Sequence, residues 1–284
     1  MNDPTLVPRD ALLGRRVAVS VSGSADLGRL GLTSTHLELV VAEITRAVIL
    51  AGGTVVYGGR IQPAGFTQII LDEVARFGGN RKCVELYVPI SEHKDTPIDV
   101  LEKIDQRLGN AGRLYLLTVD GQAQSVSKRR QEGGIIQDLD AAEGLTAMRK
   151  RVSADADARI ILGGKLSGFQ GAEPGVIEEA RFTLQAGKSL YVAGGYGGAA
   201  AAVAKVLGFD HFDWAPPAYP AHADSHQVQS ALSYLRSVYE SVKPVDGLTQ
   251  EERQVLAVSH RPANIATAVV SGLAKVQGSN REES

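Results

Sequence analysis

Two adjacent glutamates, Glu178 and Glu179, follow a glycine-rich stretch that runs from Gly163 to Gly175. The stretch joins an apolar run, residues 158–162, to an amphipathic segment, residues 176–186, which predicts a strand, a loop and a helix. Backbone N–H groups in such a loop approach an anion closely, and the helix N-terminus adds about half a positive charge. A carboxylate beside a phosphate cradle suits a nucleotide. The alternative is a glycine-rich connector whose glutamates only counter the helix dipole.

Cleavage of an N-glycosidic bond is a reaction that these residue types can perform. It requires an activated water and stabilisation of an oxocarbenium-like ribose, and a carboxylate near C1′ supplies both. Glu179 is the first candidate and Glu178 the second, unless both are solvated acids. Arg149 can pair with phosphate or with Glu179 through its planar guanidinium. The alternative is that Arg149, Lys150 and Arg151 complement the dipole at a helix end.

Short polar residues and glycines also follow two earlier predicted strands, residues 16–21 and 54–57. Their hydroxyl, carboxylate and backbone groups can hold ribose or phosphate, and glycine permits close approach. A tight turn is the alternative at Gly58 and Gly59. The predicted ligand-binding residues are Ser22, Gly23, Ser24, Asp26, Gly58, Gly59, Arg60, Gly163, Gly164, Lys165, Ser167, Gly175 and Val176.

The elements that must position these residues alternate between apolar strands and amphipathic helices. Further strands are expected at 84–88, 113–118 and 189–193, and helices at 37–50, 65–77, 98–108, 139–152 and 198–207. This alternation predicts an α/β fold, a doubly wound and mostly parallel Rossmann-like sheet, with its loops converging at one edge. We expect an N-terminal arm over 1–14, a nucleotide-binding domain over 15–208, and a C-terminal loop and helical extension over 209–284.

Composition excludes several classes of function. Thirty Lys and Arg residues nearly balance 32 Asp and Glu, so nucleic acid is a poor candidate partner. The single cysteine, Cys83, cannot form an internal disulfide, and neither a signal peptide nor a membrane-spanning run is readable, which favours the cytoplasm. His222 and His226 lie four residues apart, but a helix surface explains them, so we expect no metal site and no cofactor.

Three features leave alternatives open. The run Gly194–Gly198 resembles half of a dinucleotide fingerprint, without the acidic residue that normally follows. An aromatic and proline segment that contains Trp214, Pro216, Pro217 and Tyr219 either covers a base or packs as a loop. A predicted helix over 227–242 carries an apolar face that serves either a partner subunit or the core; its residues are Leu232, Leu235, Val238 and Val242.

The order of these motifs resembles the SLOG superfamily over about residues 15–208. Residues 19–26 are similar to its first strand and Gly-Ser loop, and residues 52–59 to its second strand, which ends in Tyr-Gly-Gly. Residues 148–150 are similar to its Arg-Lys pair, and residues 160–179 to its glycine loop and glutamate. The superfamily includes the "lonely guy" phosphoribohydrolases, the DprA DNA-processing proteins and nucleotide-sensing domains of bacterial immunity.

This resemblance implies a glycine loop that holds a 5′-phosphate while Arg149 and Glu179 act at the ribose. The chain departs from the pattern, because residues are inserted between Gly164 and Pro174 and the usual threonine is Val176, which has no hydroxyl. The departure favours the branches found beside defence effectors, where nucleotide or NAD-derived signals are the implied ligands. We therefore expect a nucleotide or ADP-ribose sensor, with an N-glycosidase as the alternative and a DprA-like DNA role as the third. Resemblance also implies a homo-oligomer and a defence effector as partners.

Overall fold

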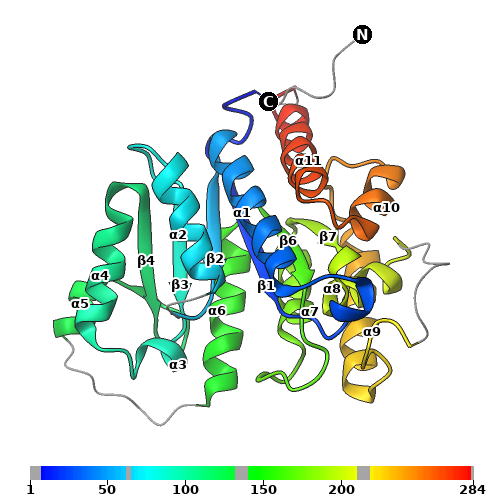
Figure 1. Ribbon diagram of the computed structural model, residues 1–284, viewed down its shortest axis with the longest axis horizontal. Coiled ribbons are helices and arrows are strands. Elements are labelled where there is room, and N and C mark those ends of the chain that lie inside the picture. Colours follow the sequence, from blue (N-terminus) through cyan, green and yellow to red (C-terminus); the bar gives the residue numbers. More distant parts are fainter. Residues whose placement is uncertain (1–7, 62–64, 132–139, 210–217, 283–284) are drawn as a thin grey trace.

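The computed structural model describes residues 8–61, 65–131, 140–209 and 218–282. Within these residues one sheet has the strand order β5-β4-β3-β2-β1-β6-β7 (Figure 1). All neighbouring strands pair in parallel except β5, which pairs with β4 in antiparallel orientation. The strands are β1 (Arg16–Ser22), β2 (Thr54–Gly58), β3 (Val84–Val88), β4 (Gly112–Leu117), β5 (Ala123–Gln124), β6 (Ala158–Gly163) and β7 (Ser189–Ala193).

Helices cover both faces of this sheet, so the predicted α/β, Rossmann-like class is confirmed. The longer ones are α1 (Ser34–Leu50), α2 (Phe66–Phe77), α4 (Ile98–Leu108), α6 (Ala141–Asp155), α7 (Gly175–Gln185), α8 (Gly198–Val206), α9 (His226–Val242), α10 (Gln250–Val258) and α11 (Pro262–Glu282). Shorter helical segments are η1 (Gly28–Leu30), α3 (Ile90–His93), η2 (Gly109–Ala111), α5 (Val126–Gln131) and η3 (Gly194–Tyr196).

Alternation along the strands distributes side chains between the two faces. Val17 and Val19 of β1 join the core beneath α1, whereas Ala18 between them joins the core beneath α6. In β6, Ile160 lies with the first group and Ile161 packs under α7, α8 and α9. Successive side chains of a strand point to opposite faces, so a strand buried on both sides reads as a continuous apolar run. Unbroken apolar runs therefore locate most of the strands in the sequence, and segments with an apolar period of 3.6 residues locate most of the long helices.

The C-terminal extension packs onto the same sheet. Helix α11 lies along α1 (Figure 1) and places Ile265 and Val269 in its core, and α9 packs against α7. The predicted apolar face of α9 closes the core through Leu232 and Leu235, which are buried. Hydrogen bonds also join the two parts, since the Tyr191 hydroxyl of β7 donates to the carbonyl of Asp246 at 2.8 Å. The helices after residue 225 therefore complete both layers around the domain.

The structure describes the N-terminal arm from residue 8 onward. Leu12 is fully buried in the core beneath α1, and its backbone N–H donates to the carbonyl of Ala51 at 2.7 Å. Residues 8–14 are thus tied to the end of α1 through a single apolar anchor. The structure also contains α3, α5 and β5, which the apolar pattern does not predict because none of them carries a continuous apolar run or a full amphipathic stripe.

Sheet order determines where a ligand has room to bind. Chain connections run from β1 outward through β2, β3 and β4, then return to β6 on the other side of β1. At such a switch point the loops after two neighbouring strands depart in opposite directions and leave a crevice at the carboxyl edge. The loops that begin after Ser22, Gly58 and Gly163 all lie at this edge.

We expect substitution by alanine to affect the free energy of unfolding differently at two helical glycines, one on α11 and one on α6. A Cβ at Gly272 of α11 would lie 2.6 Å from the carbonyl oxygen of Asp246, which is backbone. A Cβ at Gly144 of α6 would meet only a methyl group of Ile90, at 3.2 Å. Gly272→Ala should lower the unfolding free energy by about 1 to 3 kcal/mol, as overpacking does. Gly144→Ala should leave it unchanged or raise it by up to about 1 kcal/mol through helix propensity.

Urea denaturation monitored by circular dichroism measures both variants. Equal stability of Gly272→Ala and the unaltered protein would contradict the packing of α11 against residues 246–248.

Candidate functional site

A cavity of about 520 Å³ opens at the carboxyl edge beside the switch point. It is lined by residues from β1, β2, the start of α2, α3, α6 and the N-terminal part of α7, together with the loop that precedes α7. The predicted site residues that line it are Ser22, Gly23, Gly58, Gly59, Arg60, Arg149, Lys165, Gly175, Val176 and Glu179. Motifs separated by more than 150 residues in the sequence therefore meet in one place.

A second hollow, of about 710 Å³, lies along the outer side of α6. It contains none of the predicted site residues; its lining includes the turn at Gly121 and the N-terminus of α6, where the side chain of Asp140 already accepts a hydrogen bond from the Ala142 N–H. The cavity at the strand ends is the better candidate, because it lies at the switch point of the sheet, collects most of the predicted site residues and includes the N-terminus of α7, which has no side-chain cap.

The glycines after β6 shape the floor of this site. Gly164 has φ +100°, and a Cβ there would lie 2.7 Å from Ala199 and 2.9 Å from Val176. Gly163, with φ +56°, would place a Cβ 2.5 Å from the carbonyl oxygen of Ser22. Both glycines therefore let β1, β6 and α8 approach one another beneath the cavity, and neither belongs to its lining.

Gly175 at the start of α7 serves the arginine of α6. A Cβ at Gly175 would lie 2.5 Å from Nη2 of Arg149, so the missing side chain leaves room for the guanidinium. Pro174 precedes α7 in an extended conformation, and Gly175 and Val176 begin the helix at the cavity wall. The positive end of the α7 dipole and Arg149 therefore lie together on one side of the cavity.

Glu178 is engaged by α6. Its Oε2 accepts a hydrogen bond from Nη1 of Arg149, and its Oε1 accepts one from the Thr146 hydroxyl at 2.8 Å. Both oxygens have partners, and Glu178 is buried outside the cavity lining. Arg149 lines the cavity, is 9% exposed, and keeps a buried Nε that has no hydrogen-bond partner among the described residues. An orphaned donor of this kind is costly to bury unless a ligand or water meets it.

Glu179, one residue further along α7, is directed to the cavity. Its side chain is 13% exposed, and Oε2 lies 3.6 Å from Nη1 of Arg159 on β6. Arg159 itself is 1% exposed, and Glu179 is the sole carboxylate within ion-pair distance of it in the described part of the chain. Burial lowers the pKa of Arg159, and the charge of Glu179 opposes that shift. Glu179 therefore balances a buried cation and faces the cavity.

Hydroxyl groups complete the shell around Arg159. Its Nε donates to the Thr183 hydroxyl at 2.7 Å, and its two terminal nitrogens donate to Ser20 and Ser153. These partners come from α7, β1 and α6. Sequence analysis did not single out Arg159, although a lone charge inside the apolar run 158–162 is the signal that would have found it.

Tyr57 lines the cavity and was not among the predicted site residues. Its side chain is buried at the end of β2, directly before Gly58 and Gly59. Burial raises the pKa of the Tyr57 hydroxyl well above its ordinary value, and the nearby charge of Glu179 raises it further. Tyr57 is therefore a neutral hydrogen-bond donor throughout the physiological pH range.

Charged side chains of both signs surround the cavity mouth. Nε of Arg60 lies 3.2 Å from Oε1 of Glu92, and Nη2 of Arg60 donates to the side-chain carbonyl of Gln170 at 2.6 Å. Lys165 is exposed at the cavity and makes no ion pair with any described residue. An incoming anion thus meets one cation without a partner.

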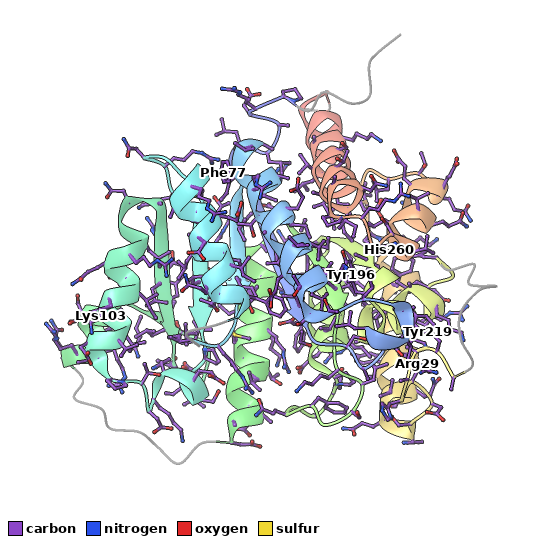
Figure 2. All side chains as sticks on the ribbon, in the orientation of Figure 1. Arg29, Phe77, Lys103, Tyr196, Tyr219 and His260 are labelled. Atoms are coloured by element: carbon purple, nitrogen blue, oxygen red, sulfur yellow. The ribbon has the colours of Figure 1, made fainter. Side chains whose placement is uncertain are left out.

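Ser24 and Asp26 lie outside the cavity, beside a second glycine-rich turn, Gly194–Gly198, which follows β7. Asp26 is fully buried, and its two oxygens accept hydrogen bonds from the backbone N–H groups of Gly198 at 2.8 Å and Ala221 at 2.9 Å. The Ser24 hydroxyl accepts from the Asp26 N–H at 3.1 Å. Figure 2 shows Arg29 beside this region, and its guanidinium lies 3.5 Å from Asp26. The N-terminus of α8 is therefore already occupied by a carboxylate of the chain itself.

The remaining expectations have definite positions. Ser167 is exposed on the loop before α7, outside the lining, and Tyr219 is buried near Tyr196 and the Gly194 carbonyl (Figure 2). Trp214, Pro216 and Pro217 lie outside the described residues. No group of three or more His, Cys, Asp or Glu suited to a metal occurs in the part of the chain that the structure describes. Among the helices described, none has the length and apolar character needed to cross a membrane.

Comparison with known proteins gives one match. A protein-family model described as SLOG cluster2 matches residues 11–255. The matched range includes β1 to α9, the first part of α10 and every residue of the cavity lining. No curated protein and no solved structure gives a significant match.

The ion pair between Glu179 and Arg159 predicts a stability effect. Glu179→Gln leaves a buried guanidinium without a counter-charge, and we expect it to lower the unfolding free energy by about 2 to 4 kcal/mol. Glu92→Gln is the matched control, because Glu92 also lines the cavity but pairs with a half-exposed arginine; its cost should stay below about 1 kcal/mol. Urea denaturation measures both.

A double variant separates loss of charge balance from loss of shape. Combining Arg159→Met with Glu179→Gln removes both charges, so it should be more stable than Glu179→Gln alone. Equal stabilities of Glu179→Gln and Glu92→Gln would contradict the assignment of Glu179 as the counter-charge of Arg159.

Proposed function

This chain belongs to the SLOG family, which indicates a nucleotide-related function, and we propose that its cavity binds a nucleotide or an NAD-derived ligand such as ADP-ribose. The observation that carries the proposal is the cationic side of the cavity, formed by Arg149, Lys165 and the start of α7; among the described residues the Arg149 Nε has no hydrogen-bond partner and Lys165 makes no ion pair. A phosphate there would gain charge-assisted hydrogen bonds from preformed donors.

Other lining residues support a sugar as the neighbouring part of the ligand. Glu179 and Glu92 offer carboxylate acceptors and Tyr57 offers a hydroxyl donor, which suits a polyol. Phe66, Leu145 and Met148 add apolar lining, which suits a base. A volume of about 520 Å³ falls within the range of small-molecule sites.

Binding as a sensor is the primary form of this proposal, in a bacterial defence or signalling setting as the family resemblance implies. Val176 stands where a threonine is usual in the family's hydrolases, and its side chain is buried in the core against Gly164. It offers no hydroxyl to a phosphate, and the inserted residues before Pro174 change the loop further. These departures favour recognition over the hydrolases' chemistry.

Hydrolysis is the second candidate, and the position of Glu179 favours it. In such a reaction a water oxygen bonds to C1′ and the C1′–N bond breaks; Glu179 accepts a proton from the water and passes it to the departing base. Glu179 faces the cavity and is fixed from below by Arg159, whereas Glu178 has both oxygens engaged. Of the two glutamates, Glu179 is therefore the one placed to act.

Calorimetric titration with AMP, ADP-ribose and NAD tests the binding proposal. Lys165→Gln should weaken the Kd of the best ligand about tenfold or more, because a hydrogen bond to a charged group contributes about 1.5 to 3 kcal/mol. Lys103→Gln is the control, since Lys103 lies on α4 at the outer edge of the molecule (Figure 2) and pairs with Asp99. Absence of binding by all three ligands, or equal weakening by both variants, would refute the proposal.

Chromatography of the same mixtures distinguishes the two candidates. The sensor proposal expects bound ligand to remain intact, with no free adenine or nicotinamide after prolonged incubation. Base release that Glu240→Gln retains and Glu179→Gln abolishes would instead establish hydrolysis; Glu240 is exposed on α9, pairs with Arg236 and lies outside the cavity lining. Binding by Glu179→Gln must be measured in parallel, because the same change removes the counter-charge of Arg159.

A further inference from the structure

The inserted loop between β6 and α7 is anchored at both ends. At its start Gly164 packs against Ala199 and Val176, and Leu166 is buried beside α7. At its far end the carboxylate of Glu173 accepts two hydrogen bonds from Arg181, at 3.1 and 3.3 Å. The neighbouring Ala172 carbonyl accepts a further bond from Gln227 of α9, at 2.5 Å.

Between these anchors the tip, residues 167–170, has few attachments. Ser167, Gly168 and Gln170 are exposed, and Phe169 is half-buried. Gly168 adopts φ +61° with open space around it, so its backbone is not constrained by packing. Gly168, Phe169 and Gln170 nevertheless line the cavity. The tip therefore covers the cavity, and Phe169 is the side chain through which it packs against the core beneath α7, α8 and α9.

One side-chain hydrogen bond joins the tip to the opposite wall of the cavity. Nη2 of Arg60, which follows β2, donates to Oε1 of Gln170 at 2.6 Å. The same guanidinium pairs through Nε with Glu92 of α3 at 3.2 Å. Arg60 is thereby held on its own wall and reaches the tip from there, and its side chain is 50% exposed. This contact spans the mouth and connects segments 110 residues apart.

We propose that residues 167–170 form a lid over the cavity and that the Arg60–Gln170 hydrogen bond is its latch. Opening breaks this bond and moves the tip, while Gly164 and Glu173 stay in place. What the lid encloses rests on the proposed function, but the latch itself is a property of the ligand-free protein. Lids of this kind exclude water from a bound ligand and limit its release.

Hydrogen–deuterium exchange of the ligand-free full chain tests the latch. Gln170→Ala and Arg60→Ala should each accelerate exchange of the amides of residues 167–171 about fivefold to tenfold, the effect of losing one such hydrogen bond. Gln68→Ala is the matched control, because Gln68 also accepts a hydrogen bond from an arginine, Arg107, with a length of 2.8 Å. Gln68 does not belong to the cavity lining. The Gln68→Ala variant should leave the tip unchanged.

Gln170→Glu gives a prediction of opposite sign. A carboxylate at this position forms an ion pair with Arg60 in place of a neutral acceptor, so exchange at the tip should slow. Unchanged exchange in both Gln170 variants, faster exchange in Gln170→Glu, or acceleration spread over the whole chain would each overturn the latch.

AMP separates this proposal from the one on which it builds. With AMP bound, Gln170→Ala should raise its dissociation rate and Gln170→Glu should lower it, each by several-fold in stopped-flow competition. Equal dissociation rates in the two variants would overturn the lid. If AMP does not bind, that result counts against the proposed nucleotide binding only. Hydrogen–deuterium exchange at the tip still tests the latch.

Discussion

Two adjacent carboxylates on α7, each opposed by an arginine from a different element, organise the candidate site. Consecutive residues of a helix point about 100° apart, so Glu178 meets Arg149 of α6 while Glu179 meets Arg159 of β6. Each buried cation therefore has a carboxylate partner. A buried cation without such a partner would be strongly destabilising. Because these two pairs balance internally, Lys165 and the α7 N-terminus remain to attract an anion to the cavity.

Sheet topology gives this charge arrangement its location. The order of strands places β1 between β2 and β6, so their carboxyl ends and the N-terminus of α7 surround one crevice. A second glycine-rich turn follows β7, yet Asp26 already occupies the N-terminus of α8 beside it. The two glycine-rich segments thus differ in role. The stretch that precedes α7 borders the open cavity, whereas the turn after β7 packs against Asp26 of the chain itself. Asp26 illustrates why residue type and spacing alone do not separate a ligand contact from a structural cap.

Much of the fold follows from the sequence, since each strand buried on both faces reads as an apolar run and each long helix carries a 3.6-residue stripe. Strand Ser189–Ala193 and helix Ile98–Leu108 have the predicted bounds. The two-residue strand Ala123–Gln124 carries too little pattern to predict. Ten predicted site residues line the cavity. The glycines in the sequence mark the ends of the strands, and the carboxyl ends of parallel strands meet at one edge of the sheet. The lone charge of Arg159 inside an apolar run marks the residue, but its role could not be predicted because it depends on hydroxyls contributed by three other elements, which no local pattern contains.

A crystal structure of the full chain grown with AMP tests the central claim most directly. The account predicts that the phosphate lies against the first turn of α7 and Lys165, with the ribose on the side of Glu179 and Arg159 still paired beneath it. AMP bound elsewhere on the molecule, or the carboxylate of Glu179 turned away from the ribose, would contradict the account.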